Sequence, residues 1–362
     1  MESSLGARAV RVLEQAYVTA ARRNGETVTT LDVLAWVAAH DNRIFPGATW
    51  TDLKYLATKP TGIRDAPEPA PGPFHADVPA ILREVEWRAH RLPRMSLPAS
   101  PDWTPAVRFV LTGALNSARV PFVGLPNLAL EMLRLPDCSG TKALFPYEYA
   151  RAAAVERLAT DPALRYPDKP HPTVDDVRVM VTTGRRPLLD RLFLRMSRFA
   201  RVSPLLTETT LEARRQAVRL GHGVISPEHL LLALLTLDDV LAAAGIAIPP
   251  GHNQGAALLR AHGLAAADLT YGISLRPAPA EPPAEDLTAQ LDRLRPGDPF
   301  DATASVQAQA MEISLTRHHP DTGTSHLLLA LLDTSAAGLV TDPDALRSQA
   351  TRDLDAVPAA WP

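Results

Sequence analysis

One sequence unit recurs four times along the chain of 362 residues, and this repetition constrains the fold more than any other feature. The run His-Leu-Leu-Leu-Ala-Leu-Leu occurs identically at 229–235 and at 326–332. Weaker copies lie at 28–37 and 123–133, so that successive copies are roughly 100 residues apart. A near-constant spacing is typical of one supersecondary element used repeatedly. We therefore expect four copies of a single structural unit.

The residues around the third copy predict two consecutive helices. Ser226 is a favourable N-cap, and Pro227 suits the first helical position, where its missing N–H costs nothing. The residues at 230–235 are apolar on every side, which is typical of a helix buried between other helices. An amphipathic stretch over 203–220 precedes this helix and is closed by Gly221. The unit therefore opens as helix, short turn, helix.

The remainder of each unit extends an all-α prediction. After the third copy we expect short helices over 255–263 and from Ala265 onward, and after the fourth copy a helix that begins at Pro343. Each unit would then contain four short helices. Strands have almost no support, because no stretch shows sustained two-residue alternation between hairpin turns.

The linkers indicate that the four copies are arranged as two pairs. A proline-rich stretch at 67–73 and an amphipathic helix at 81–92 follow the first copy, and a similar stretch at 277–283 and a helix at 285–294 follow the third. We therefore predict two tandem domains, each a pseudo-duplicated pair of four-helix units. Their predicted bounds are 1–175 and 202–362, with a basic amphipathic connector helix over 176–201.

Composition and charge exclude several classes of function. The net charge of −3 argues against nucleic acid or an anionic membrane as a partner of the whole chain. The basic stretch over 178–201 could dock an acidic partner or phosphate, but it is most simply the solvated face of the connector helix. No apolar run approaches the ~20 residues of a membrane span. Cys138 is the single cysteine, which fits a reducing compartment. We expect a cytoplasmic protein.

The motif copies resemble the Clp amino-terminal (Clp repeat) domain of Clp-type AAA+ unfoldases. That domain duplicates a four-helix unit with a Gly-Thr-Glu-His-Leu-Leu-Leu-Gly-Leu type motif, which a helix opening in Phe-Thr-Pro and closing in Leu-Gly-His precedes. The residues at 226–235 and 323–332 match the motif, those at 220–222 match the helix closure, and Trp-Thr-Pro at 103–105 resembles the opening. The similarity is strong over about 200–362 and weak over 1–175.

The resemblance implies a docking module for substrates and adaptors. No Gly-x-x-x-x-Gly-Lys-[Ser/Thr] phosphate loop occurs in the sequence, and the residues at 140–142 lack the upstream glycine that would let backbone amides hold phosphate. We therefore expect a non-catalytic protein- or peptide-binding protein of the Clp proteolysis system, acting as an adaptor, regulator or decoy without AAA+ modules. Its partners would be Clp unfoldase or peptidase subunits, their substrates, or peptides.

The resemblance also implies a set of binding positions. Family members bind peptides near the starts of the first helices of the two units, which correspond here to the surroundings of Val202 and Phe300. The helix before the fourth copy is shifted by about one residue, which makes this correspondence loose. Glu228 keeps the glutamate with which some members recognise phosphorylated arginine, and Ser325 stands at the same position of the fourth copy. With one glutamate in four copies, a paired phosphoarginine site is not expected.

The motif histidines have a structural and a chemical interpretation. A histidine in the first turn of a buried helix is more often packed and hydrogen-bonded than catalytic, so we assign four residues to the structural motif: Ser226, His229, Thr324 and His326. The cluster over 318–326 contains metal-binding residue types, but each is explained by a helix end, a turn or a helix start. No nucleophile motif occurs. We expect no catalytic residue, no metal and no cofactor.

Two other functions stay open at the level of sequence. An orphan domain of this kind could sequester a small molecule or cyclic peptide that attacks the unfoldase, and so confer resistance. An unrecognised enzyme in the degenerate N-terminal half ranks last, because the sequence displays no convergent set of polar groups there.

Overall fold

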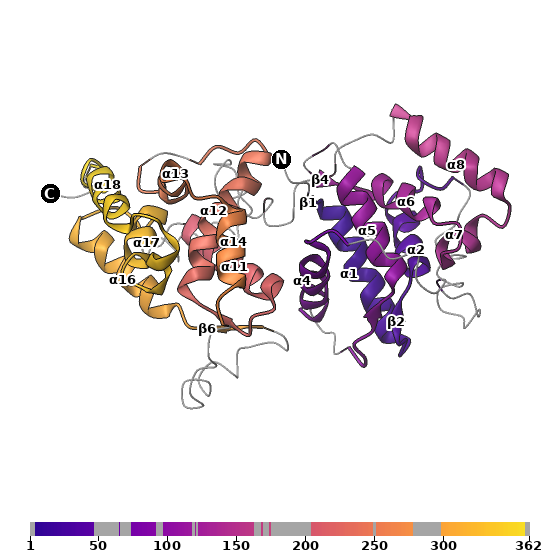
Figure 1. The fold of residues 1–362 in the computed structure, drawn as a ribbon, viewed down its shortest axis with the longest axis horizontal. Coiled ribbons are helices and arrows are strands. Elements are labelled where there is room, and N and C mark those ends of the chain that lie inside the picture. The colour runs from indigo at the N-terminus through magenta and orange to yellow at the C-terminus, as the bar shows by residue number, and fades with distance from the viewer. Residues whose placement is uncertain are drawn as a thin grey trace, which may run out of the picture. The chain divides into compact units, whose positions relative to one another are not determined.

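The computed structural model describes residues 4–46, 65, 74–91, 97–117, 120, 122–162, 168, 174, 204–248, 251–277 and 298–358. The chain divides into two compact units, unit 1 over Met1–Pro172 and unit 2 over Thr173–Pro362 (Figure 1). Sequence analysis predicted domains over 1–175 and 202–362. The predicted connector helix over 176–201 lies outside the described residues, as does the helix predicted over 285–294.

Unit 1 is mostly helical and contains two very short parallel ladders (Figure 1). Its described elements are β1 (Ser4–Leu5), α1 (Ala7–Arg22), β2 (Thr27–Val28), α2 (Thr30–His40), α4 (Val78–His90), β3 (Asp102–Trp103), α5 (Pro105–Ser117), β4 (Phe122–Val123), α6 (Leu125–Arg134), α7 (Ser139–Leu144) and α8 (Glu148–Thr160).

Unit 2 is built in the same way, and its helices begin close to the predicted positions. Its described elements are α11 (Pro204–Leu220), β5 (Val224–Ile225), α12 (Pro227–Ala243), α13 (Gly255–Ala261), α14 (Ala266–Ser274), β6 (Phe300–Asp301), α16 (Ala304–Thr316), α17 (Thr324–Leu331), the 3₁₀ helix η2 (Ser335–Leu339) and α18 (Pro343–Asp355). No helix among the described residues of either unit is long and apolar enough to cross a membrane.

The strands are the one feature of the fold class that sequence analysis missed. In unit 1, β1 pairs with β4 and β2 pairs with β3, both in parallel. The first strand of each half thus pairs with the second strand of the other half, as an approximate two-fold axis requires. Each strand has two residues, which is too short for an alternating pattern to be visible. The prediction of a mainly helical chain is confirmed, since the described strands are few and have two residues each.

The ladder of unit 2 corresponds to one ladder of unit 1. The β5–β6 ladder pairs Ile225 with Asp301 as the β2–β3 ladder pairs Val28 with Trp103. The helix that precedes each ladder ends on a left-handed residue, Asn24 after α1 and Gly221 after α11. These landmarks align α1 with α11 residue by residue. Fully buried alanines occupy the same places in both helices: Ala16 and Ala20 in α1, Ala213 and Ala217 in α11.

The helices that follow the ladders correspond in the same way. Thr104 stands immediately before α5, and Thr303 stands immediately before α16. Counted from the ladder, α16 begins one residue later than α5, which is the shift that the sequence indicates before the fourth copy. Counted from the two threonines, the buried positions coincide: Val107 and Leu111 in α5, Val306 and Ala310 in α16.

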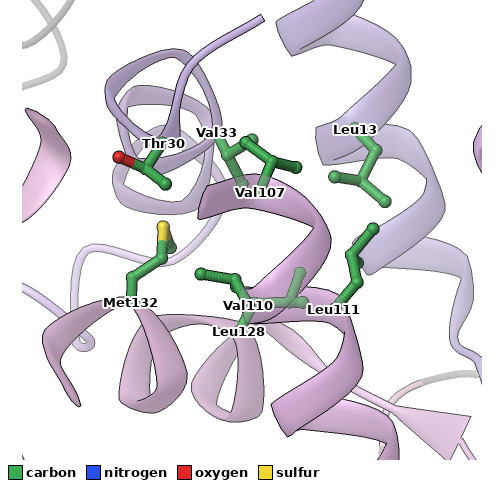
Figure 2. Close-up of a pocket in the computed structure, with 8 residues that line it drawn as sticks. All are labelled: Leu13, Thr30, Val33, Val107, Val110, Leu111, Leu128 and Met132. Atoms are coloured by element: carbon green, nitrogen blue, oxygen red, sulfur yellow. The ribbon is translucent and has the colours of Figure 1, made fainter. Parts of the chain in front are cut away.

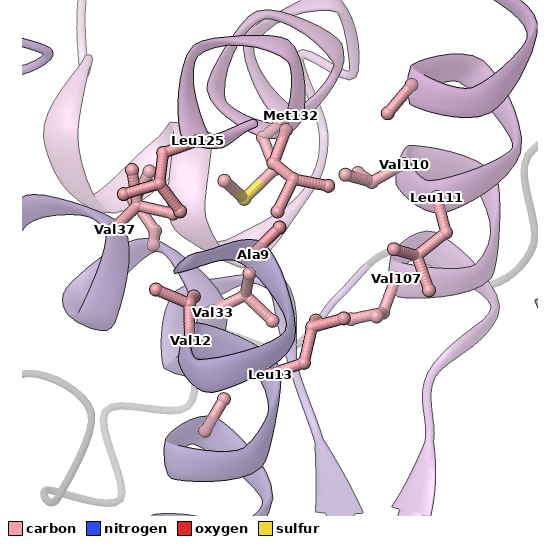
Figure 3. Packing of buried hydrophobic residues seen from close by; sticks show 14 of the residues in the cluster. Ala9, Val12, Leu13, Val33, Val37, Val107, Val110, Leu111, Leu125 and Met132 are labelled. Carbon is pink, nitrogen blue, oxygen red and sulfur yellow. The ribbon is translucent and has the colours of Figure 1, made fainter. Parts of the chain in front are cut away.

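The core of each unit lies between its motif helices and the helices that precede them. Figure 3 shows residues of α1, such as Leu13, close to Val107 and Leu111 of α5. In unit 2 all six residues from Leu230 to Leu235 are buried in the core, as their uniformly apolar sequence predicted. Because this part of α12 is buried on all sides, it leaves binding to the outer helices and to the helix starts.

Candidate functional site

All four motif helices begin with the same hydrogen-bonded arrangement. The third residue of the helix accepts a hydrogen bond from the backbone N–H of the N-cap residue, which satisfies one of the amides that a helix start leaves without a partner. The four pairs are Thr29 to Asp32 (2.8 Å), Gly124 to Asn127 (3.2 Å), Ser226 to His229 (3.0 Å) and Gly323 to His326 (2.9 Å). Asp32 and Asn127 depart from the motif histidine, yet they supply the same acceptor.

The two motif histidines of unit 2 are each joined to a second histidine. His229 Nε2 lies 3.0 Å from His222 Nδ1, and His326 Nε2 lies 2.7 Å from His319 Nδ1. Because Nδ1 of His229 and of His326 accepts from a backbone amide, the proton of each neutral ring is on Nε2 and is donated to the partner. Both nitrogens of each motif histidine are therefore engaged, and neither ring offers a lone pair to a metal.

Burial keeps these motif histidines neutral. Desolvation, and then the neighbouring His222, lowers the pKa of His229 to about 4. Desolvation, followed by His319 and His252, lowers the pKa of His326 to about 3. Within the described part of the chain no group of three or more His, Cys, Asp or Glu residues could hold a metal ion.

The predicted binding residues of unit 2 make internal contacts. Glu228 lies at the start of α12 with its Oε1 3.3 Å from Arg276 Nη1. Burial by itself would raise the pKa of Glu228, but hydrogen bonds from Ser226 and Ser335 and the charge of Arg276 outweigh it and lower the pKa. Phe300 is buried in β6 opposite Val224.

The start of α17 is also closed by the chain itself. The buried Ser325 Oγ accepts from the backbone N–H of Gln254 (2.9 Å), and the Ser325 amide donates to the carbonyl of His252 (2.9 Å). Thr324 donates its amide to Asn253 Oδ1 (3.2 Å) and accepts from the Gly255 amide (3.2 Å). Val202, the remaining predicted binding residue, lies outside the described residues.

A groove lies between α11 and α16, the helices that precede the two motif helices of unit 2. It has a volume of about 180 Å³ and is lined by Leu206, Thr207, Thr210, Leu211, Gln307 and Met311. None of these side chains is charged. Leu206 is buried at the floor, whereas Leu211 is 41% exposed at the rim. Leu315, one turn beyond Met311 on α16, is 46% exposed and extends the apolar surface.

Sequence analysis placed peptide binding near Val202 and Phe300 and did not identify the lining of this groove. Glu228, Phe300 and Ser325 do not line the groove between α11 and α16. A signal for the lining was present in the pattern of α11, where Leu211 lies outside the face formed by the buried Leu206, Ala213 and Ala217. An apolar residue on the exposed side of an amphipathic helix contributes to a surface that a partner can cover.

A space inside the core of unit 1 is too small to hold a ligand. Figure 2 shows a space between α1, α2, α5 and α6, but it has no room for a water molecule. Its walls are apolar except for Thr30, as the full set shows: Leu13, Thr30, Val33, Val107, Val110, Leu111, Leu128 and Met132. It is a small imperfection in core packing and not a ligand cavity.

In unit 1 the chain's own carboxylates occupy the places where helix starts converge. Asp65 accepts hydrogen bonds from the amide (3.0 Å) and hydroxyl (2.6 Å) of Thr30, from the amide (2.8 Å) and hydroxyl (2.7 Å) of Ser139, and from the hydroxyl of Thr104 (2.6 Å). It thereby joins the starts of α2, α7 and α5. Asp168 accepts from the amides of Arg8 (3.1 Å) and Ala9 (3.2 Å) at the start of α1. Sequence analysis missed both aspartates.

Comparison with family models, with curated proteins and with solved structures finds no match. The described residues themselves define a mostly helical protein of two compact units, one of which carries an uncharged groove between two outer helices.

Proposed function

We propose that this protein binds peptide segments of other proteins without catalysis, through the groove between α11 and α16 of unit 2. The observation that carries the proposal is the lining: an apolar floor and rim, two threonine hydroxyls and one glutamine amide, with no charge. A peptide presents apolar side chains together with amides and carbonyls, and these hydroxyl and amide groups can hydrogen-bond to them. Partly exposed leucines beside the groove add apolar area that a bound chain would remove from water.

The size of the groove favours peptide anchors over whole small molecules. Sites for drug-sized ligands have volumes of about 300–1,000 Å³. A groove of about 180 Å³ holds one or two side chains of a longer ligand. This argues against sequestration of a small molecule or cyclic peptide as the main activity.

The motif resemblance supports a place in the Clp proteolysis system. In this proposal the protein acts as an adaptor, regulator or decoy, and the bound segments belong to Clp unfoldase or peptidase subunits or to their substrates. The sequence contains no phosphate-binding loop, so the proposed role requires no ATP hydrolysis by the chain.

The groove is tested by two substitutions and one matched control. Leu211→Asp and Met311→Asp place a charge in the lining, whereas Leu275→Asp makes the same change at a 67% exposed leucine that does not line the groove. Peptides selected from a display library on the full chain should bind both groove variants at least tenfold more weakly, since burial of one such side chain is worth roughly 1.5–3 kcal/mol. The control should bind as the original chain does.

Equal peptide affinities for all three variants would show that the groove between α11 and α16 is not the binding site. For the link to Clp, the same variants serve as baits in a lysate, with quantification of unfoldase and peptidase subunits by mass spectrometry. Enrichment on the original chain and on Leu275→Asp, but not on the groove variants, is the expected result. Absence of these subunits and their substrates from every bait would remove the Clp assignment and leave peptide binding as a separate question.

A further inference from the structure

Helix α1 of unit 1 begins with a cation at a position where helices disfavour positive charge. Arg8 lies in the first turn of α1, at the positive end of the helix dipole, and Arg11 lies three residues further along the same face. Arg11 is exposed and Arg8 is half-buried. Among the residues that the structure describes, no carboxylate lies within ion-pair distance of either guanidinium. Arginines placed in this way indicate a surface whose counter-charge comes from elsewhere.

A third basic group faces the same place from α2. His40 is the last residue of α2, and its Nε2 lies 2.8 Å from Oε1 of Gln15, which stands one turn beyond Arg11 on α1. Burial, and then the charges of Arg11 and Arg8, lower the pKa of His40. The three basic groups therefore repel one another. Arg8, Arg11, Gln15 and His40 together form a surface that we call the arginine face.

Two carboxylates of unit 1 lie near the arginine face, and both have other partners. Asp168 Oδ2 accepts the backbone amide of Arg8 (3.1 Å) and so satisfies the start of α1. Glu14, beside the face on α1, lies with its Oε1 3.8 Å from Arg88 Nε. Burial raises the pKa of Glu14, although the charges of Arg88 and Arg11 oppose it. Neither carboxylate pairs with the guanidinium groups of the arginine face.

The corresponding face of unit 2 is covered by polypeptide. With α1 aligned to α11 and α2 to α12 through their ladders, Arg8 corresponds to Leu205 and His40 to Leu237. Both leucines are buried in a small hydrophobic cluster with Val174, a residue that precedes α11 in the chain. In unit 2 this face thus packs against a segment from outside its own two helices.

The charges at these positions specify what could cover the arginine face. Arg11 corresponds to the buried Glu208, and Gln15 to the buried Glu212. Unit 2 thus has leucines and carboxylates where unit 1 has cations, so a segment that fits unit 1 carries negative charge. The chain's own stretch over 178–201 is rich in arginine and has the wrong charge. The net charge of −3 argues against nucleic acid as the source of the negative charge.

We infer that the arginine face of unit 1 binds an acidic segment of a partner protein. Arginine pairs well with carboxylates because its planar guanidinium can donate two parallel hydrogen bonds to one carboxylate. Two guanidinium groups about one helical turn apart can therefore hold neighbouring carboxylates of the segment. This surface lies in unit 1 and is independent of the groove between α11 and α16 in unit 2.

The experiment measures binding of a fluorescein-labelled oligoglutamate peptide to the full chain by anisotropy at low ionic strength. Arg8→Gln with Arg11→Gln should weaken binding about tenfold, because both pairing groups are lost. The matched control, Arg22→Gln with Arg134→Gln, removes two cations of unit 1 outside the face, one exposed and one half-exposed in its side chain. Its affinity should stay within about twofold of the original chain. Added salt should weaken binding to the original chain.

A second measurement reports on the site itself. NMR titration of the imidazoles should show that saturating oligoglutamate raises the pKa of His40, since a carboxylate beside the ring stabilises its protonated form. The same peptide should not move the imidazole resonances of His90. A pKa of His40 that does not change in the presence of bound peptide would place the peptide elsewhere and overturn the proposal.

The remaining outcomes separate the possible occupants. Equal oligoglutamate affinities for the face variant and its control would refute binding at the arginine face. Tighter binding of a single-stranded oligonucleotide to the same arginines would make the partner a nucleic acid. If amides in place of the acids over 281–292 raise oligoglutamate affinity about tenfold, the chain's own acidic residues occupy the face, and the partner segment is refuted. Leu211→Asp should leave oligoglutamate binding unchanged, so failure of the groove and failure of this surface are distinguishable.

Discussion

The two units meet the same backbone requirement at their motif helices with different chemical groups. In unit 1 the N-cap amide is satisfied by the carboxylate of Asp32, which Arg23 also contacts (2.8 Å), and by the amide of Asn127. In unit 2 it is satisfied by the imidazoles of His229 and His326. The motif position thus requires a hydrogen-bond acceptor. The choice of acceptor decides how the unfolding free energy of the unit depends on pH.

The units also differ in what covers their outer helices. In unit 1, α4 packs across α1 and α5, and the aspartates at 65 and 168 occupy the converging helix starts. In unit 2 the corresponding surface between α11 and α16 is a groove. Among the residues that the structure describes, a helix thus covers this surface in unit 1 and a groove lies there in unit 2, which makes unit 2 the candidate for binding at this surface.

The largest expected difference between the units is their response to acid. The pKa values of His229 and His326 are lowered to about 4 and about 3, so below pH 6.5 the unfolded chain binds protons that the folded unit 2 does not. The unfolding free energy of unit 2 should therefore fall between pH 6.5 and pH 4, by on the order of 5 kcal/mol for the two residues. In unit 1, burial raises the pKa of Asp32 against the opposing effect of Arg23, so protonation of Asp32 as the pH falls does not destabilise the folded unit.

Urea titrations at pH 7 and pH 4 measure this difference. A short hydrogen-exchange pulse reports on unit 2 through residues 226–241 and on unit 1 through residues 28–37. The midpoint for unit 2 should drop at pH 4 by much more than that for unit 1. Equal losses in both units would contradict the contribution assigned to the motif histidines.

The next largest effect concerns the closed helix starts of unit 1. Asp65→Ala removes the shared acceptor of three helix starts, and at about 1 kcal/mol for each lost cap it should lower the unfolding free energy of unit 1 by about 3 kcal/mol. Asp137→Ala is the control, because this carboxylate is 73% exposed and pairs only at the surface with Lys142. Its cost should stay below about 0.5 kcal/mol. Urea unfolding followed by tryptophan fluorescence measures both changes, because four of the five tryptophans of the chain belong to unit 1.

A smaller effect tests whether the two kinds of acceptor are interchangeable. His326→Asn places in the fourth copy the amide group that Asn127 provides in the second. The asparagine keeps the hydrogen bond to the N-cap amide but cannot take up a proton as the pH falls. The loss of unit 2 stability between pH 6.5 and pH 4 should shrink by about half, or roughly 2–3 kcal/mol. His262→Asn, at a histidine outside the motif, should leave that loss as it was. An unchanged loss in His326→Asn would show that other groups cause the acid response.

Much of the helical framework could be predicted because its signals are local. Pro227 and Pro343 mark the helix starts that the structure has, and Gly221 ends α11 in the left-handed conformation. A helix forms its hydrogen bonds within a few residues, so capping and apolar spacing can be predicted from one stretch of sequence. The burial of Leu230 through Leu235 could be predicted for the same reason.

The candidate site was less accessible to sequence reasoning. The ladders join residues far apart in the chain, such as Val224 and Phe300, and two-residue strands leave no pattern. The contacts of Asp65 come from three helices, and nothing around it in the sequence distinguishes it from other loop aspartates. The groove consists of side chains from two helices, so neither helix alone predicts it.

By itself, the sequence determined the number of repeats, the mainly helical character and the positions of the principal helix starts and ends. These depend on interactions between near neighbours in the chain. Only the tertiary structure decided that the motif histidines act as helix caps paired with other histidines, that α4 covers α1 and α5, and that α11 and α16 enclose a groove. Those features depend on which distant segments pack together, and packing is settled by the whole chain at once.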